Sequence, residues 1–259
     1  MMKRDGAYAH LAGVYEYLCD DCDYERWSQY FVCLTRAGLY GNGAEKDGLQ
    51  SLQGKKGVDF GCGSGVFSRA FAREGCIMTG VDISENMLSA AEKKTREEGL
   101  RVAYLAGDIA RFKATEKYDF ALAANDVINY VPKAKLLSAA KRTAAALRPG
   151  GAFVFDISSK SKFLNKIDGK ISADDRDDVT YLSFGKVSGD VATLDVTLFV
   201  RRADGAFTRF DELHTQYVYD EAEIRSALTL AGFEILSVTG LFGEEKTAAD
   251  RLCFLAKKK

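Results

Sequence analysis

Residues 57–65 of this chain read Gly57-Val58-Asp59-Phe60-Gly61-Cys62-Gly63-Ser64-Gly65, a short apolar run that ends in three alternating glycines. Residues 58–60 are typical of a buried strand, and residues 66–74 place apolar side chains at helical spacing. Glycine lets the backbone turn tightly and approach a ligand closely, because it has no Cβ that would collide. The stretch therefore predicts a strand, a glycine turn and a helix, with a ligand site at the carboxyl end of the strand.

Short apolar strands and amphipathic helices alternate from this turn to residue 158. The expected strands are residues 77–81, 102–106, 120–124 and 152–155, and the expected helices are residues 85–98 and 133–147. Ser84 is expected to cap the first of these helices, and Pro149-Gly150-Gly151 to form the turn that follows the second. This alternation predicts an α/β fold with a doubly wound parallel sheet.

The alternation stops at residue 159 and resumes at residue 220. Residues 191–200 and 207–219 are expected to be strands joined by a hairpin turn at Asp204-Gly205, so they predict a small antiparallel β insertion. The acidic residues 172–178 are expected to form a loop. After the insertion, Asp220-Glu221-Ala222-Glu223 is typical of a capping box, and two strands are expected at residues 233–241 and 251–255.

We therefore expect four parts in one chain of 259 residues. Residues 1–45 form a helical cover, and within it the leader (residues 6–39) is rich in tyrosine. The other parts are the α/β core at 46–158, the insertion at 159–219, and a C-terminal helix with two strands at 220–259 that completes the core sheet.

Composition and charge favour an ordinary soluble protein. Lysine and arginine number 36 against 37 acidic residues, which disfavours a nucleic-acid binder that relies on bulk charge. No apolar run approaches the roughly 18 residues of a membrane span. Six scattered cysteines suit a reducing compartment, so a cytoplasmic protein without a membrane partner is expected. A zinc site at Cys19 and Cys22 would need two further ligands, for which Cys33 and His10 are the only nearby candidates, so no metal site is expected.

The glycine turn differs from a dinucleotide fingerprint. That fingerprint, G-x-G-x-x-G, requires glycine at position 66, where this chain has Val66. The third glycine comes one residue earlier, at Gly65, and Asp59 precedes the first. A carboxylate at that position suits a ligand with an ammonium group better than a pyrophosphate. The turn therefore disfavours a nucleotide-cofactor oxidoreductase.

The D-x-G-x-G-x-G stretch resembles the first motif of class I S-adenosylmethionine (SAM) dependent methyltransferases. Three further stretches resemble later motifs of that family at the corresponding strand ends: Gly80-Val81-Asp82-Ile83-Ser84, Ala106-Gly107-Asp108-Ile109 and Leu147-Arg148-Pro149-Gly150-Gly151. The resemblance implies a Rossmann-like, seven-stranded mixed sheet with an antiparallel final strand. It also implies SAM as the cofactor and S-adenosylhomocysteine as the product.

The same resemblance assigns cofactor-binding residues. Asp82 would accept hydrogen bonds from the ribose hydroxyls, Ile83 would lie against the adenine ring, and Asp108 would accept from the adenine amino group. The Ile109 N–H would face the neighbouring ring nitrogen. The remaining candidates for this role are Asp59, Gly61, Gly63, Gly65 and Asn125.

The leader and the stretch Glu212-Leu213-His214-Thr215-Gln216 resemble small-molecule methyltransferases of the amino-sugar and glycine N-methylating kind. In those relatives an N-terminal helical segment covers the cofactor and a β insertion roofs the substrate. By this likeness Tyr15 and Trp27 are placed near the methionine end of SAM, where aromatic faces suit a sulfonium. The catalytic candidates are Asp126, Tyr130 and His214, the last as a general base.

The expected function is methyl transfer to a nitrogen or oxygen atom of a small-molecule acceptor. The positive sulfur is already a good leaving group, so the protein's main task is to position the reactants. The stretch after residue 124 lacks the N/D-P-P-Y/F pattern of enzymes that methylate nucleobase amino groups. The alternatives are an RNA or protein acceptor, and a regulator that binds SAM without catalysis. A monomer or a homodimer is expected.

Overall fold

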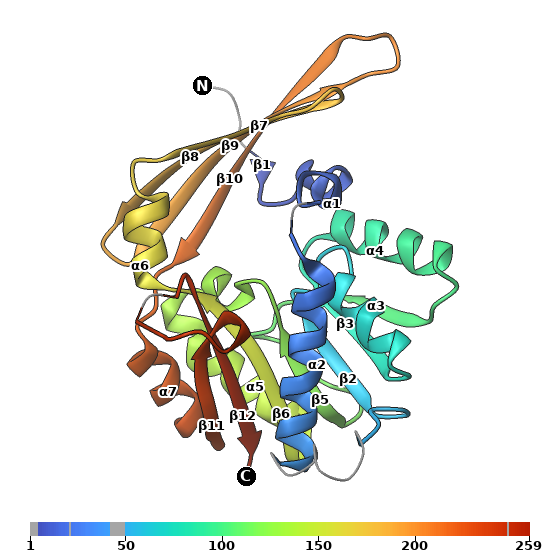
Figure 1. Ribbon diagram of the computed structural model, residues 1–259, viewed down its shortest axis with the longest axis vertical. Helices are drawn as coiled ribbons and strands as arrows, with labels where there is room; N and C mark the ends of the chain where they lie inside the picture. The colour runs from blue at the N-terminus through green and yellow to red at the C-terminus, as the bar shows by residue number, and fades with distance from the viewer. Residues whose placement is uncertain (1–4, 21, 42–49, 248) are drawn as a thin grey trace.

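The computed structural model describes residues 5–20, 22–41, 50–247 and 249–259. Within these residues the chain forms a seven-stranded sheet with helices on both faces and a separate five-stranded sheet (Figure 1). The predicted boundary between residues 45 and 46 lies outside the described residues. Within the described part of the chain, no helix combines the length and apolarity needed to cross a membrane.

The large sheet is the α/β core that the glycine turn predicted. Its spatial order is β11 (Phe233–Gly240), β12 (Arg251–Lys258), β6 (Leu147–Ser158), β5 (Tyr118–Ala123), β2 (Lys56–Phe60), β3 (Ile77–Asp82) and β4 (Val102–Ala106). β12 runs antiparallel to both of its neighbours, and the other pairs are parallel. The Rossmann-like mixed sheet with an antiparallel final strand is therefore confirmed.

Helices cover both faces of this sheet because successive strand residues point to opposite sides. Ala152 and Val154 pack beneath α2 (Tyr24–Tyr40) and α3 (Val66–Arg73), whereas Phe153 and Phe155 pack against α5 (Leu136–Ala146) and α7 (Glu221–Leu230). α4 (Glu85–Glu97) packs on β3 and β4. The predicted caps are confirmed: Ser84 Oγ accepts from the Met87 N–H, and the capping box opens α7 at Asp220.

Helix α5 and strand β6 differ in detail from the prediction. A short 3-10 turn, η4 (Lys133–Lys135), precedes α5. The predicted turn at Pro149-Gly150-Gly151 lies inside β6, where the pairing with β5 slips between Leu147 and Ala152. Gly150 has a φ of +76° at this irregularity, a backbone conformation that glycine adopts more easily than other residues.

The insertion is an antiparallel sheet, as predicted. It begins with α6 (Lys160–Lys162) and a π-helical turn, η5 (Phe163–Ile167), and its strands are β7 (Ile171–Asp175), β8 (Val179–Ser188), β9 (Val191–Arg201) and β10 (Phe207–Tyr217). The prediction of a loop over residues 172–178 is wrong at its start, because β7 pairs with β8. β7 is an edge strand with mostly exposed side chains, so acidic residues are tolerated there and discourage further pairing.

The leader runs between the two sheets. It begins in β1 (Asp5–Gly6), contains η1 (Leu11–Gly13) and α1 (Tyr15–Leu18), and continues into α2 (Figure 1). β1 joins the insertion sheet parallel to β10, with Asp5 opposite Glu212. On the core side, Glu16 pairs with Lys94 of α4 and Arg69 of α3. These contacts hold the leader above the carboxyl ends of the core strands.

Candidate functional site

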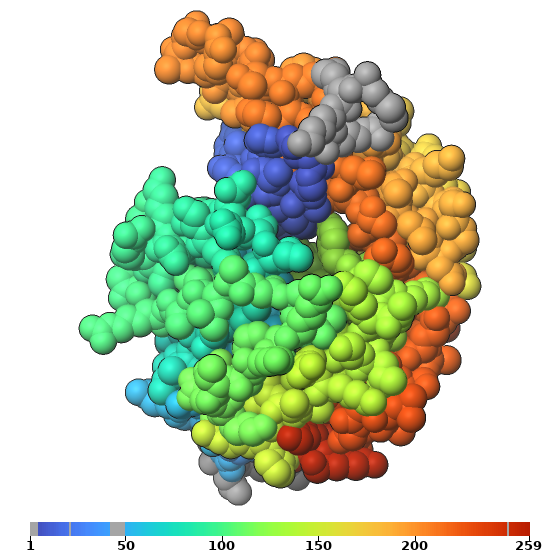
Figure 2. Space-filling view, turned by 180° about the vertical axis from the view of Figure 1, so that it is seen from behind, coloured from blue at the N-terminus to red at the C-terminus, as the bar shows by residue number. Residues whose placement is uncertain are grey.

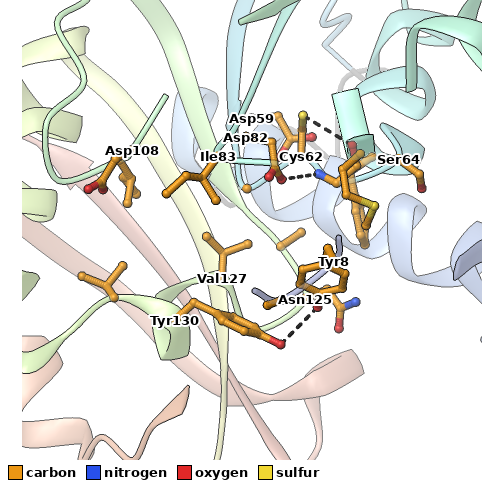
Figure 3. Close-up of a pocket in the computed structure, with 18 of the residues that line it drawn as sticks. Tyr8, Asp59, Cys62, Ser64, Asp82, Ile83, Asp108, Asn125, Val127 and Tyr130 are labelled. Carbon is orange, nitrogen blue, oxygen red and sulfur yellow. Dashed lines mark hydrogen bonds between the residues drawn. The ribbon is translucent and has the colours of Figure 1, made fainter. Parts of the chain in front are cut away.

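A cavity of about 380 Å³ lies at the carboxyl ends of β2, β3 and β5, beside the loop that follows β4. The leader contributes Ala7, Tyr8, Tyr15 and Tyr24 to its lining. Figure 2 shows the leader, in blue, wedged between the core and the insertion above a recess in the surface. Figure 3 shows that Asp82, Ile83 and Asp108 lie toward one end of the cavity and Tyr8, Asn125 and Tyr130 toward the other. The cavity thus has two chemically different ends.

The glycine turn forms part of the floor. Gly61, Gly63 and Gly65 all have positive φ values, of +63°, +53° and +82°. A Cβ on Gly61 would lie 2.4 Å from Val127, and one on Gly65 would lie 2.3 Å from the Tyr104 hydroxyl. Gly61 and Gly63 line the cavity, whereas Gly65 packs against Tyr104 of β4 and Ala91 of α4. The turn needs glycine both for its backbone and for close packing.

Asp82 ends β3 and points its carboxylate into the cavity. Its two oxygens accept hydrogen bonds from the N–H groups of Gly63 and Ser84, each at 2.8 Å. Burial raises the pKa of this carboxyl despite these bonds. The next side chain, Ile83, also lines the cavity and is 78% exposed. It offers an apolar surface against which a flat ring could pack.

Asp108 and Ile109 lie beyond Ile83. Asp108 accepts from the Ala110 N–H at 2.8 Å, and its carboxylate is 3.7 Å from Lys135 Nζ. Ile109 is buried, and both residues line the cavity. Together with Asp82 and Ile83, they provide two acids separated by apolar surface, which suits a ligand with a polar sugar and a flat base.

Asp59 is the most buried acid in the lining. Ser68 Oγ donates to it at 2.7 Å, and burial raises the pKa of its carboxyl to about 7. Burial also raises the pKa of the neighbouring Cys62 thiol well above its usual value, so this cysteine is no thiolate nucleophile. A cationic ligand group beside Asp59 would therefore stabilise its ionised form.

Asn125 and Asp126 form a strained turn after β5, with φ values of +64° and +54°. The buried Asp156 carboxylate accepts from both of their N–H groups. Arg251 pairs with Asp156 and also donates to Asn125 Oδ1 at 2.8 Å. This contact fixes the Asn125 amide, so that its Nδ2 donates to the Tyr15 hydroxyl at 2.9 Å.

Four sequence candidates do not line the cavity as far as the described residues show. Asp126 turns away and accepts from Ser158 Oγ at 2.9 Å. The Trp27 ring is buried against Phe67, with the Arg251 guanidinium above it. Gly65 packs as described above, and His214 is buried behind the lining. The remaining candidates all reach the cavity: Tyr15, Asp59, Gly61, Gly63, Asp82, Ile83, Asp108, Ile109, Asn125 and Tyr130.

His214 still belongs to the site through a hydrogen-bond chain. Its Nδ1 lies 3.2 Å from the Tyr130 hydroxyl, which lies 3.1 Å from the Tyr8 hydroxyl (Figure 3 shows the last contact). Its Nε2 lies 2.9 Å from Glu212. Burial raises the pKa of both phenols well above the usual value, so both keep their hydrogens.

Three residues at the site were not predicted from the sequence: Tyr8, Glu212 and Lys135. For Glu212 a signal existed, since alternate residues of a strand share one face. Glu212, His214 and Gln216 are all buried, while Leu213 between the first two is exposed. A buried polar face on a strand needs partners for every group, which points to a hydrogen-bond network.

Comparisons with known proteins agree with this geometry. A sequence model described as "Methyltransferase domain" matches residues 58–151. A protein of Geobacillus sp. (strain WCH70) named "Putative methyltransferase" is 28% identical over 97% of this chain and 99% of its own length. The crystal structure of a SAM-dependent methyltransferase from Clostridium acetobutylicum superposes with a TM-score of 0.83 at 26% identity, covering 98% of this chain and 99% of that one. A sugar N-methyltransferase from Streptoalloteichus sp. shares the fold, with a TM-score of 0.79 at 19% identity, covering 100% and 97%.

The sheet order, the glycine turn and the acids that follow β3 and β4 define an α/β enzyme with a nucleoside-type ligand site. The similarity to methyltransferases along nearly the whole chain identifies which class of such enzymes it is. This chain belongs to the class I S-adenosylmethionine-dependent methyltransferases, and SAM is its cofactor.

Proposed function

We propose that this enzyme methylates a nitrogen or oxygen atom of a small molecule that it encloses together with SAM. The observation that carries the proposal is the two-ended cavity beneath the leader, whose acceptor end is built from phenols of the leader and of the turn after β5. When bound, SAM supplies a methyl group on a positively charged sulfur. The chain's own residues then have to bind, orient and exclude water.

The cofactor end fits the nucleoside half of SAM. We assign Asp82 to the ribose hydroxyls, since its carboxylate oxygens have free lone pairs besides those used by two N–H groups. Ile83 and Ile109 offer apolar surface for adenine, and Asp108 offers an acceptor for its amino group. Asp59, beside Gly61 and Gly63, is assigned to the ammonium of the methionine part, which would offset the high cost of ionising this buried carboxyl.

The acceptor end is aromatic and uncharged. Tyr8, Tyr15, Tyr130 and Asn125 supply hydroxyl and amide groups there, and burial raises the pKa of all three phenols. Among the described lining residues, Lys135 is the one lysine or arginine, and it lies at the other end beside Asp108. This composition favours an acceptor with N–H or O–H groups over one held by a carboxylate or phosphate.

We also propose roles for the parts of the chain that surround the cavity. The leader covers the cofactor, and the insertion, which pairs with β1 and lies behind the lining, roofs the acceptor, so that water is kept from the reacting atoms. The buried thiols Cys62, Cys76 and Cys253 suit the reducing cytoplasm. We expect a monomer or a homodimer there.

The acceptor class can be tested with SAM that carries an isotope-labelled methyl group. The enzyme is incubated with a cell extract divided by dialysis into small molecules and macromolecules. Label that enters the dialysable fraction, and fails to do so with the Asp82→Ala variant, supports the proposal. Label in RNA or protein alone would overturn it in favour of a macromolecular acceptor. Absence of transfer to both fractions by protein that binds SAM would favour a regulatory role.

A further inference from the structure

Four polar groups connect the buried face of β10 to the acceptor end of the cavity. Glu212 and His214 are 1% and 4% exposed and contact each other. From His214 the hydrogen-bond chain continues through the hydroxyls of Tyr130 and Tyr8. The Tyr8 ring also packs edge-on against His214, with the ring centres 4.9 Å apart. Only the two tyrosines reach the cavity, so Glu212 acts on it from behind.

Glu212 accepts several hydrogen bonds at once. Its Oε1 accepts from the N–H groups of His10 and Leu11, and its Oε2 accepts from the Tyr8 N–H and from His214 Nε2, both at 2.9 Å. Burial alone would raise the pKa of Glu212, but these donors hold it below its ordinary value. The group is therefore a carboxylate with no hydrogen to donate.

A carboxylate at this position determines the tautomer of the neutral imidazole. His214 Nε2 carries the hydrogen that Glu212 accepts, so Nδ1 is left with a lone pair. The Tyr130 hydroxyl then donates to Nδ1, and its oxygen accepts from the Tyr8 hydroxyl. The hydrogens of these three hydrogen bonds all point away from the cavity. The Tyr8 oxygen therefore keeps lone pairs for a ligand.

Glu212 also holds Tyr8 in place. Tyr8 has a φ of +61°, a conformation that a bulky residue rarely adopts without support. Its N–H is held by Glu212 and its carbonyl accepts from Ser84 Oγ at 3.3 Å. One buried carboxylate thus secures both the position of the Tyr8 backbone and the direction of its hydroxyl hydrogen.

We propose that Glu212 is a positioning residue that directs the chain through His214, Tyr130 and Tyr8, so that a phenol oxygen accepts an N–H or O–H of the methyl acceptor. The inference rests on the proposed function for its use in methyl transfer, and it deepens that function by naming how the acceptor atom is oriented. When the N–H or O–H of the acceptor donates to this phenol oxygen, a lone pair on the acceptor's nitrogen or oxygen stays free to attack the methyl group. No proton transfer along the chain is required.

The tautomer of His214 can be measured without any substrate. The chain has two histidines, so ¹⁵N–¹H correlation spectra contain two imidazoles, and His10→Gln assigns them. We expect the Nε2–H tautomer for His214 in the wild-type protein. In Glu212→Gln, Oε1 stays with two backbone N–H groups and the amide nitrogen faces His214, so the Nδ1–H tautomer is expected. An Nδ1–H tautomer in the wild-type protein would overturn the proposal.

A matched control separates this effect from loosening of the leader. Asn86 Nδ2 donates to the Ala9 carbonyl at 2.6 Å, which anchors the leader without touching the chain of four groups. Asn86→Ala should therefore leave the tautomer unchanged. A tautomer shift in Asn86→Ala equal to that in Glu212→Gln would show that leader packing alone is responsible and would contradict the proposal.

The direction of the Tyr8 hydroxyl, where the hydrogen-bond chain meets the cavity, is tested with two ligands that differ at the reacting centre. Sinefungin carries an amine where SAM carries its methyl group, whereas S-adenosylhomocysteine carries neither. We expect Glu212→Gln to reduce the preference for sinefungin about tenfold, because a hydroxyl hydrogen then faces the cationic amine. In a Tyr130→Phe background the same change should have a clearly smaller effect, since only the hydrogen bond to the Tyr8 backbone is then lost. An equal loss in both backgrounds would overturn the proposal. Failure of wild-type protein to bind either ligand would instead contradict the proposed function.

Discussion

Replacing Asp59 with asparagine should stabilise the ligand-free protein at neutral pH and weaken its hold on the cofactor. Asp59 is 1% exposed, and burial raises the pKa of its carboxyl from 3.8 to about 7. Between these values the folded state keeps a proton that the unfolded state releases. The wild-type protein therefore loses stability as pH rises from about 4 to about 7, and the loss is constant above that range.

The size of this effect follows from the two pKa values. The full difference corresponds to roughly 4 kcal/mol. Asparagine has the same shape, can accept from Ser68 Oγ, and has no proton to lose. The stability advantage of Asp59→Asn over the wild-type protein should therefore grow by about 3 kcal/mol between about pH 5 and about pH 8.

Denaturant unfolding of both proteins at the two pH values measures this difference. Asp119→Asn is the matched control. Burial would raise the pKa of Asp119, but the Lys56 N–H and the Arg148 guanidinium hold it below its ordinary value. Its stabilising contribution is lost only as pH falls below about 4, so the effect of that variant should be the same at both pH values. An Asp59→Asn effect that is equally independent of pH would refute the reasoning.

Three further variants test other parts of the structure. Gly61→Ala should cost more than about 1 kcal/mol in unfolding free energy, since its φ is +63° and a Cβ would strike Val127. Arg251→Met should cost about 3–5 kcal/mol in the same assay, because it leaves the buried Asp156 carboxylate without its partner. Glu16→Gln removes the ionic contacts of the leader with α3 and α4, so amide hydrogen exchange across α1 should become faster while exchange in β5 stays unchanged.

The core fold and the end of the cavity that holds Asp82 and Asp108 could be predicted because their signals are local. The strand, glycine turn and helix at residues 57–74 follow from a few adjacent residues, and the order of strands and helices implied the rest. The acids Asp82 and Asp108 occur at strand ends, which meet at one edge of a parallel sheet. Their place in the cavity therefore follows from topology alone.

At the other end of the cavity, Tyr15, Asn125 and Tyr130 were predicted as site residues, but the contacts among the residues there could not be predicted because they join distant segments. Tyr8, Tyr130 and His214 come from the leader, the turn after β5 and the insertion, and no spacing in the sequence brings them together. Trp27 was placed near the methionine end by likeness, yet its side of α2 faces the core. The strand β7 was not predicted because its acidic composition is typical of a loop. It forms a strand through its pairing with β8.

Calorimetric titration with S-adenosylhomocysteine tests most directly whether the cavity is the cofactor site. The wild-type protein should bind with micromolar affinity, and Asp82→Ala should lose at least about tenfold, since it removes a charged acceptor of hydrogen bonds. NAD serves as the control ligand and should not bind. Equal binding by the wild-type protein and a folded Asp82→Ala variant, or binding of NAD in place of the adenosyl ligand, would contradict the assignment.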